Sequence, residues 1–244
     1  MRGLITAIRT LTIFPVPGKD ADDLSDSLFF FPLVGALLGL VMALVGWCVS
    51  SLLGWPSGAG AVCVAFSVLM TGGIHPDGLA DVFDALGCST RERRLAVMKD
   101  PHVGSYGIIA VVVFLMLKYV AFTRLCELER YWWIILPYVI SRTVQVEIAA
   151  CLPYAREGEG TGRRFVEGAT GWHFVGACIL AGLLCFAVAG WYGVVLLILS
   201  CAIGLILVRW IRHEFGGATG DLLGMSSELA ETFVLFVSAL LGGL

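Results

Sequence analysis

Three aspartates stand close together directly after a long apolar stretch. Asp77, Asp81 and Asp84 follow the segment Ser27 to Pro76, which contains no Lys, Arg, Asp or Glu. On a helix the three positions share one face, where their negative charges repel one another. A bound cation removes this repulsion, and Mg²⁺ prefers carboxylate oxygens beside a substrate phosphate. We interpret the aspartates as metal ligands; the alternative is a solvated acidic patch where a helix leaves a membrane.

A second motif near the end of the chain has the same form. Residues 216–221 read Gly-Gly-Ala-Thr-Gly-Asp and residues 72–77 read Gly-Gly-Ile-His-Pro-Asp, so both match Gly-Gly-x-x-x-Asp. The spacing between the two motifs also relates Asp84 to Glu228. A glycine-rich turn at a helix start offers free backbone N–H groups to an anion. We predict an internal pseudo-repeat whose two acidic helices meet at one face of the protein.

The composition is that of a membrane protein. Hydrophobic residues make up 58% of the chain and charged residues 14%, whereas a soluble domain has roughly 25% charged residues. The net charge of −3 gives no sign of nucleic-acid binding, and no nucleic-acid partner is expected. The eight cysteines include no Cys-x-x-Cys pair. We expect them to be small buried hydrophobes rather than a disulfide framework or a zinc site.

The apolar runs predict an all-α, polytopic membrane helix bundle with about six to seven transmembrane helices, since one span needs about 20 residues. The residues before Pro15 form a predicted interfacial helix. The final segment, 232–244, is too short to span alone, so it must borrow residues from the preceding helix or pack as a half-span. We expect residues 1–244 to form a single integral-membrane catalytic domain. The predicted spans are 29–53, 58–74, 104–123, 131–152 and two within 168–208 that turn at 190–193.

Lys and Arg are distributed unequally between the predicted loops. Most lie in the segments 1–27, 75–103, 153–171 and 209–227, whereas the opposite side has only Arg124 and Arg130. Basic loops remain in the cytoplasm. This predicts a multi-pass protein of the cytoplasmic (inner) membrane, with its N-terminus and active-site loops on the cytoplasmic side.

Several single polar residues are open to two interpretations. Arg142 and Glu147 lie within one predicted span, and intramembrane charges are functional candidates, although these two could form a structural pair. We expect Lys118, near the end of its span, to extend to the membrane interface. His75 is a candidate to contact the substrate or to take part in proton transfer. The alternative is an interfacial histidine bonded to the backbone. Asp100 is a candidate ligand or an ordinary turn aspartate.

Five ordered motifs together resemble the cobalamin synthase family, the adenosylcobinamide-GDP ribazoletransferases, over nearly the whole chain. Pro76, Ala85 and Pro101-His102 depart from the family pattern, but no acidic or glycine position is lost. The motifs lie at residues 11–17, 72–84, 98–107, 152–156 and 216–228.

The resemblance implies a Mg²⁺-dependent transferase of a phosphorus-containing group. Such an enzyme joins adenosylcobinamide-GDP to α-ribazole, or to its 5′-phosphate, and releases GMP in the last step of adenosylcobalamin (vitamin B12) nucleotide-loop assembly. A ribose hydroxyl attacks the phosphorus that bears the cobinamide arm, and catalysis depends on positioning and charge neutralisation. The partners implied are these two substrates and the lipid bilayer, with a second copy of the chain or other cobalamin-assembly enzymes left open.

The resemblance also assigns roles to residues. The candidates to orient or deprotonate the attacking hydroxyl are His75, Asp100 and Glu228. The candidates to offset the developing negative charge are Lys99 and Arg142. The implied Mg²⁺ ligands are Asp77, Asp81, Asp84 and Asp221. The implied substrate-binding residues are Gly72, Gly73, Gly78, Arg156, Gly216, Gly217, Thr219 and Gly220.

Two other functions remain as alternatives. A CDP-alcohol phosphotransferase also groups aspartates on transmembrane helices. Its motif, however, begins Asp-Gly-x-x-Ala-Arg, whereas position 82 here, after Asp81, is Val. A transporter would suit the charges within the span and the apparent repeat. The acidic clusters, however, lie at predicted helix ends rather than at mid-membrane.

Overall fold

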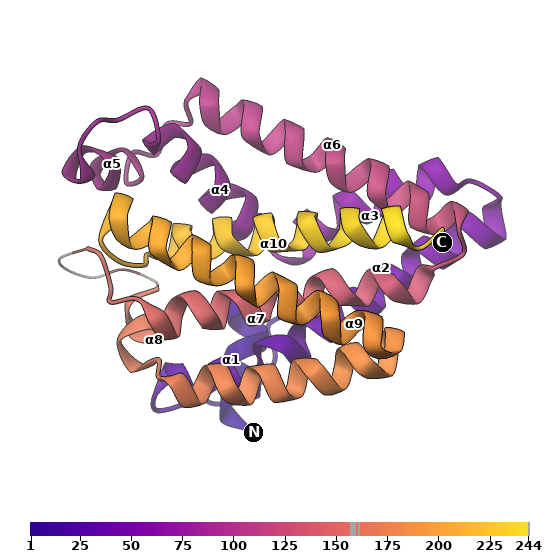
Figure 1. Ribbon diagram of the computed structural model, residues 1–244, viewed down its shortest axis with the longest axis horizontal. Helices are drawn as coiled ribbons and strands as arrows, with labels where there is room; N and C mark the ends of the chain where they lie inside the picture. The colour runs from indigo at the N-terminus through magenta and orange to yellow at the C-terminus, as the bar shows by residue number, and fades with distance from the viewer. Residues whose placement is uncertain (157–159, 161, 244) are drawn as a thin grey trace.

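A computed structural model of the chain describes residues 1–156, 160 and 162–243. Within these ranges the elements are helices, apart from one isolated parallel bridge between Tyr154 and Ala218. The long helices run roughly side by side along the long axis of the molecule (Figure 1). The predicted all-α polytopic bundle is therefore confirmed.

Helix α7 (Ile135–Cys151) lies at the centre of the bundle. It packs against α2 (Phe31–Trp47), α9 (Gly171–Phe215) and α10 (Gly220–Leu241), and most of its side chains are buried. A span whose polar residues are enclosed by protein on all sides can carry charges that lipid would not accept. This explains how α7 contains both Arg142 and Glu147.

Within the described ranges, five helical segments are long and apolar enough to cross a membrane, or up to six if a bent pair forms one span. The first runs from Leu24 to Leu52 through α2 and the short helices η1 (Leu24–Phe30) and η2 (Cys48–Leu52). The chain is thus a multi-pass membrane protein. The final predicted segment does borrow residues, because α10 begins at Gly220 and continues to Leu241.

The longest helix, α9, consists of two arms joined at a break. Its backbone leaves the helical conformation at Ala189 and Gly190, where Gly190 has a φ of 58°. A positive φ is readily adopted by glycine alone, and the chain doubles back on itself here (Figure 1). The turn predicted at 190–193 is confirmed.

The bent pair is α3 (Pro56–Met70) and α4 (Ile74–Ala85), which meet at an angle of 87°. Gly72 and Gly73 connect them with φ values of 64° and 73°. The predicted span at 58–74 therefore ends early, at Met70, because two left-handed glycines redirect the chain. This bend allows α4 to pack against α6 (Ser105–Glu127) and α10.

Short helices and loops lie around the long helices of the bundle. Helix α1 (Arg2–Leu11) confirms the predicted N-terminal helix, and the acidic loop after it folds back to pair Arg2 with Asp22 at 2.8 Å and Arg9 with Asp20 at 3.0 Å. Helices α5 (Arg91–Val97) and α8 (Arg163–Gly168) lie near the start of α10 (Figure 1). The remaining short helix, η3 (Tyr131–Ile134), leads into α7.

Candidate active site

The two Gly-Gly-x-x-x-Asp motifs meet where α4 crosses α10. A methyl group added at Gly78 would lie 2.6 Å from the backbone oxygen of Asp221 and 3.0 Å from its Cα. These distances are too short for any side chain at position 78, so the two backbones approach as closely as two helices can. Two motifs far apart in the sequence are thereby held together.

A cavity of about 460 Å³ opens at this crossing and contains an aspartate from each motif, Asp77 and Asp221. Its volume falls within the range of about 300–1,000 Å³ for small-molecule sites. His75 and Gln145 contribute further polar side chains, and Gly220 contributes backbone. The remaining lining is largely apolar and includes Leu11, Leu28, Phe31, Phe165 and Leu223.

Asp81 lies among other carboxylates and is half-buried. Burial disfavours its charged form, the charges of Asp221, Asp77 and Asp84 act in the same direction, and the guanidinium of Arg156 acts against them. Like charges gathered at a half-buried position are unfavourable unless a cation joins them. A positively charged ligand beside Asp81 would relieve this repulsion, which among the described residues Arg156 alone acts against.

Asp84 is bonded to the start of α6. Its Oδ2 accepts a hydrogen bond from the Gly104 amide at 2.7 Å, and its Oδ1 accepts one from the Gly107 amide at 2.8 Å. A Cβ at either glycine would lie 2.5 Å from an Asp84 oxygen. The carboxylate therefore satisfies free N–H groups at a helix N-terminus, which explains the two glycines of the 98–107 motif.

Arg156 belongs to a loop that is attached to the second glycine motif. The Ala155 amide donates to Ala218 O at 2.9 Å, and the Ala218 amide donates to Pro153 O at 2.8 Å. From this loop Arg156 reaches Asp221, with Nη2 2.6 Å from Oδ2. The 152–156 motif thus supplies a cation to the aspartate of the 216–228 motif.

The other predicted substrate-binding positions shape the turns around the cavity. Gly216 ends α9 with a φ of 75° and faces the guanidinium of Arg91, and Gly217 packs closely on Pro153 O. Thr219 accepts a hydrogen bond from the Leu222 amide at 3.3 Å and so caps α10. Gly72 and Gly73 form the bend described above. Of the predicted glycines, Gly220 lines the cavity directly.

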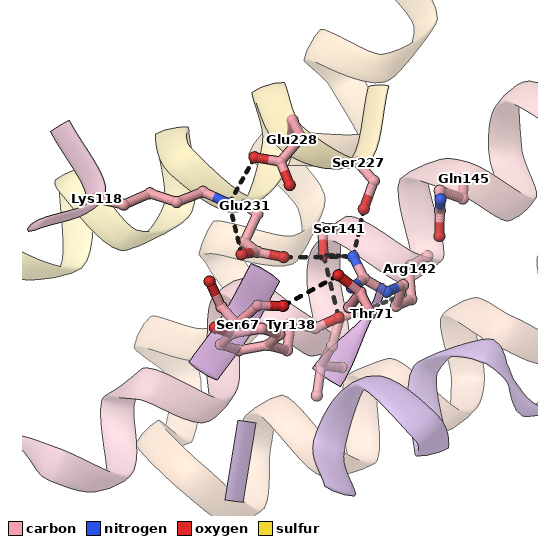
Figure 2. A network of polar contacts seen from close by, with 12 residues as sticks. Ser67, Thr71, Lys118, Tyr138, Ser141, Arg142, Gln145, Ser227, Glu228 and Glu231 are labelled. Carbon is pink, nitrogen blue, oxygen red and sulfur yellow. Dashed lines mark hydrogen bonds and ion pairs between the residues drawn. The ribbon is translucent and has the colours of Figure 1, made fainter. Parts of the chain in front are cut away.

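A buried ion network lies farther along α10 (Figure 2). Lys118 contacts Glu228 at 2.6 Å and Glu231 at 2.8 Å. Arg142 contacts Glu231 at 3.3 Å and also donates to Ser227 and Ser141. All four charged residues are at most 4% exposed, so α6, α7 and α10 are joined by charged groups that are buried away from water.

One sequence-based expectation about these charges is wrong, and one of the two interpretations left open is excluded. Lys118 does not extend to the interface, because Glu228 and Glu231 hold it inside the bundle. Arg142 does not pair with Glu147: it contacts Glu231 of α10, whereas Glu147 faces α9, where a Cβ at Gly204 would lie 2.1 Å from Glu147 Oε2. Positions five apart on a helix point ~140° away from each other.

The predicted catalytic residues separate into three places. His75 lines the cavity and is 2% exposed. Glu228 and Arg142 belong to the buried ion network. Lys99 and Asp100 lie on the exposed loop between α5 and α6, where hydrogen bonds from the His102 amide and ring lower the pKa of Asp100.

Sequence reasoning did not single out Gln145. It lies on α7, lines the cavity and is 4% exposed. A polar amide inside a predicted span was the available signal, since such groups are retained within membranes for structural or functional reasons. The charged neighbours Arg142 and Glu147 drew attention away from it.

The fold defines a class, that of helical multi-pass membrane proteins, and in this one the aspartates of two Gly-Gly-x-x-x-Asp motifs line a single cavity. The family model described as cobalamin-5-phosphate synthase matches residues 3–239. The chain belongs to this family, and it is a transferase of cobalamin synthesis. The match supports this assignment over the CDP-alcohol phosphotransferase and transporter alternatives.

Relatives of known name agree with the family. The chain is 45% identical, over 98% of its length and 97% of the relative's, to a protein of Prosthecochloris aestuarii named adenosylcobinamide-GDP ribazoletransferase. A protein of Desulfitobacterium hafniense with the same name is 34% identical, over 96% of this chain and 95% of the relative. No solved structure matches the chain.

Proposed function

We propose that this enzyme transfers the adenosylcobinamide phosphoryl group of adenosylcobinamide-GDP to α-ribazole, or to its 5′-phosphate, and releases GMP. The relatives' name supports the donor and the acceptor. The observation that carries the proposal is that aspartates of both glycine motifs line one cavity. In the reaction, a ribose hydroxyl forms a bond to the phosphorus bearing the cobinamide arm, and the bond from that phosphorus to GMP breaks.

The donor chemistry of the site fits Mg²⁺. Among the described residues no group of three or more His, Cys, Asp or Glu side chains is placed to hold a metal ion by itself. Mg²⁺, however, is commonly held by one or two carboxylates together with substrate phosphates and water. We propose Asp77, Asp81 and Asp221 as its ligands. Asp84, also on α4, supports them by its hydrogen bonds to the start of α6. When bound, the ion would neutralise negative charge on the pyrophosphate of the donor.

The protein side chains then have distinct roles. His75 is the predicted base that lines the cavity, so it is the group we propose to orient the hydroxyl and accept its proton. Arg156 positions Asp221 through their ion pair. Glu228 and Arg142 act from a distance by fixing α7 and α10. Lys99 and Asp100 lie on an exposed loop, where contact with the large cobinamide portion of the donor is the role open to them.

Release of GMP by the purified full chain tests this proposal. The protein in detergent or nanodiscs is given adenosylcobinamide-GDP with α-ribazole, and Mg²⁺ is varied. We expect GMP release to require the acceptor and Mg²⁺, with no CMP release from CDP-alcohol donors. GMP release that is unaffected by removal of divalent ions would exclude the metal, and no release under any of these conditions would exclude the transfer.

A further inference from the structure

Two side chains that line the cavity each have a buried polar atom without a partner among the described residues. The Gln145 side-chain amide donates from Nε2 to Leu223 O at 3.2 Å. That contact fixes the orientation of the amide, because a carbonyl oxygen can only accept. Its Oε1 is therefore presented as an acceptor, and among the described residues no group bonds to it.

His75 provides the second such atom. Its ring is 2% exposed, and its Nε2 is buried without a partner among the described residues. Buried polar atoms are almost always hydrogen-bonded, since leaving one unpaired costs its full desolvation free energy. Gln145 and His75 come from different helices, α7 and α4, and both line the cavity. A ligand with hydroxyl groups would satisfy both atoms.

The apolar part of the cavity lining suits a flat apolar ring. Phe31 and Phe165 lie with ring centroids 6.3 Å apart and ring planes tilted by 52°, and Leu28 and Leu223 complete the apolar lining. Aromatic side chains bind planar rings through their faces and edges. A guanine base would need several hydrogen-bonding partners around its edge, whereas the apolar lining offers contact without such partners.

Taken with the proposed function, on which this inference rests, we propose that the cavity is the binding site of the acceptor nucleoside. Gln145 Oε1 and His75 Nε2 hydrogen-bond its ribose hydroxyls, and the Phe31–Phe165 side holds its aromatic base. The ribose then lies beside Asp77 and Asp221, where the attacked phosphorus must come. A neutral nucleoside can enter this acidic cavity without the repulsion that a pyrophosphate would meet in the absence of a cation.

Binding of α-ribazole to the full-length protein, measured by calorimetry without the second substrate, tests the site. Gln145→Leu removes the acceptor and keeps the size. We expect it to weaken α-ribazole binding about 10-fold or more, because the ribose hydroxyl loses the oxygen that accepts its hydrogen bond. In turnover the KM for α-ribazole should rise while the KM for adenosylcobinamide-GDP is unchanged. Thr143→Val, on the same helix and fully buried, is the matched control and should change neither.

A second variant covers the apolar part of the cavity lining. Phe165→Leu should weaken α-ribazole binding but leave binding of free ribose unchanged, because only the base loses a contact. Unchanged α-ribazole binding in both variants would overturn the proposal. A raised KM for adenosylcobinamide-GDP alone would also overturn it and would place the donor in this cavity. GMP release by the unaltered protein is measured in parallel, so failure of the proposed function is seen separately.

Discussion

Arg156 Nη2 lies 2.6 Å from Asp221 Oδ2, so a loop residue after α7 neutralises the aspartate at the start of α10. The pair is largely buried and lies beside the crossing of α4 and α10. We expect Arg156→Ala to lower kcat/KM for GMP release by about 10-fold or more, since a charged hydrogen bond at the site is lost. Arg156→Lys keeps the charge without the planar fork and should retain part of the activity. Equal activity of all three proteins would show that the pair has no role in turnover.

Asp81 is the carboxylate on which the charges of Asp221, Asp77 and Asp84 act. Asp81→Asn keeps its size and removes one charge, so the fold should survive while turnover falls on the order of 10²-fold or more and the Mg²⁺ requirement increases. GMP release measured against Mg²⁺ concentration shows both effects. Asp22→Asn, which removes an exposed carboxylate paired with Arg2, is the matched control. Turnover near normal in Asp81→Asn would exclude it as a ligand.

Gly78 permits the close contact of the two motifs. Gly78→Ala places a methyl group 2.6 Å from Asp221 O, so α4 and α10 must separate. We expect lost activity and a lowered unfolding temperature in detergent. Gly182→Ala, at a helical glycine with nothing within 4 Å of an added Cβ, should be neutral or slightly stabilising. If both substitutions have the same small effect, the crossing tolerates separation and the two motifs act independently.

Among the described residues, Lys118 is the one cation that forms an ion pair with Glu228. Lys118→Met leaves Glu228 unpaired in the bundle interior, and we expect a loss of about 3–5 kcal/mol in the free energy of unfolding. Chemical unfolding of the purified protein in detergent measures it. Arg124→Met breaks an exposed pair with Glu127 at 3.4 Å and should cost less than about 1 kcal/mol. Similar losses in the two variants would mean that the buried network adds no stability.

The distribution of Lys and Arg predicts which end of the bundle is cytoplasmic. In a chain whose exposed Cys48 is replaced by serine, Glu92→Cys and Glu127→Cys introduce thiols at opposite ends. In intact cells, a membrane-impermeant maleimide should label position 127 and leave position 92 unlabelled until the membrane is opened. The reverse pattern would invert the orientation and place the cavity on the outer side.

Hydropathy and motif spacing were sufficient to predict the helices and the meeting of the two glycine motifs. The apolar runs correspond to spanning helices, and the Gly-Gly-x-x-x-Asp repeat correctly indicated that Asp77 and Asp221 would share a cavity. Both signals are local: a span needs continuous apolar sequence, and a left-handed turn needs glycine.

The partners of buried polar groups could not be predicted in the same way. Whether Arg142 meets Glu147 or Glu231 depends on how α7 is rotated against α9 and α10, and that rotation is set by packing around the whole helix. The same holds for Lys118, whose position near a helix end suggested contact with water. The position of Gln145 beside the cavity, with its amide bonded to Leu223 O of α10, depends on the same packing.

The buried ion network also has an electrical consequence. Lys118 and Arg142 carry two formal positive charges, and Glu228 and Glu231 carry two negative ones, so the four groups sum to zero. A single uncompensated charge would gain or lose about 2.3 kcal/mol for every 100 mV if it crossed the membrane potential. Because the charges cancel, the membrane voltage exerts no net force on the network. The helices it joins should keep their positions whether the cell membrane is energised or depolarised.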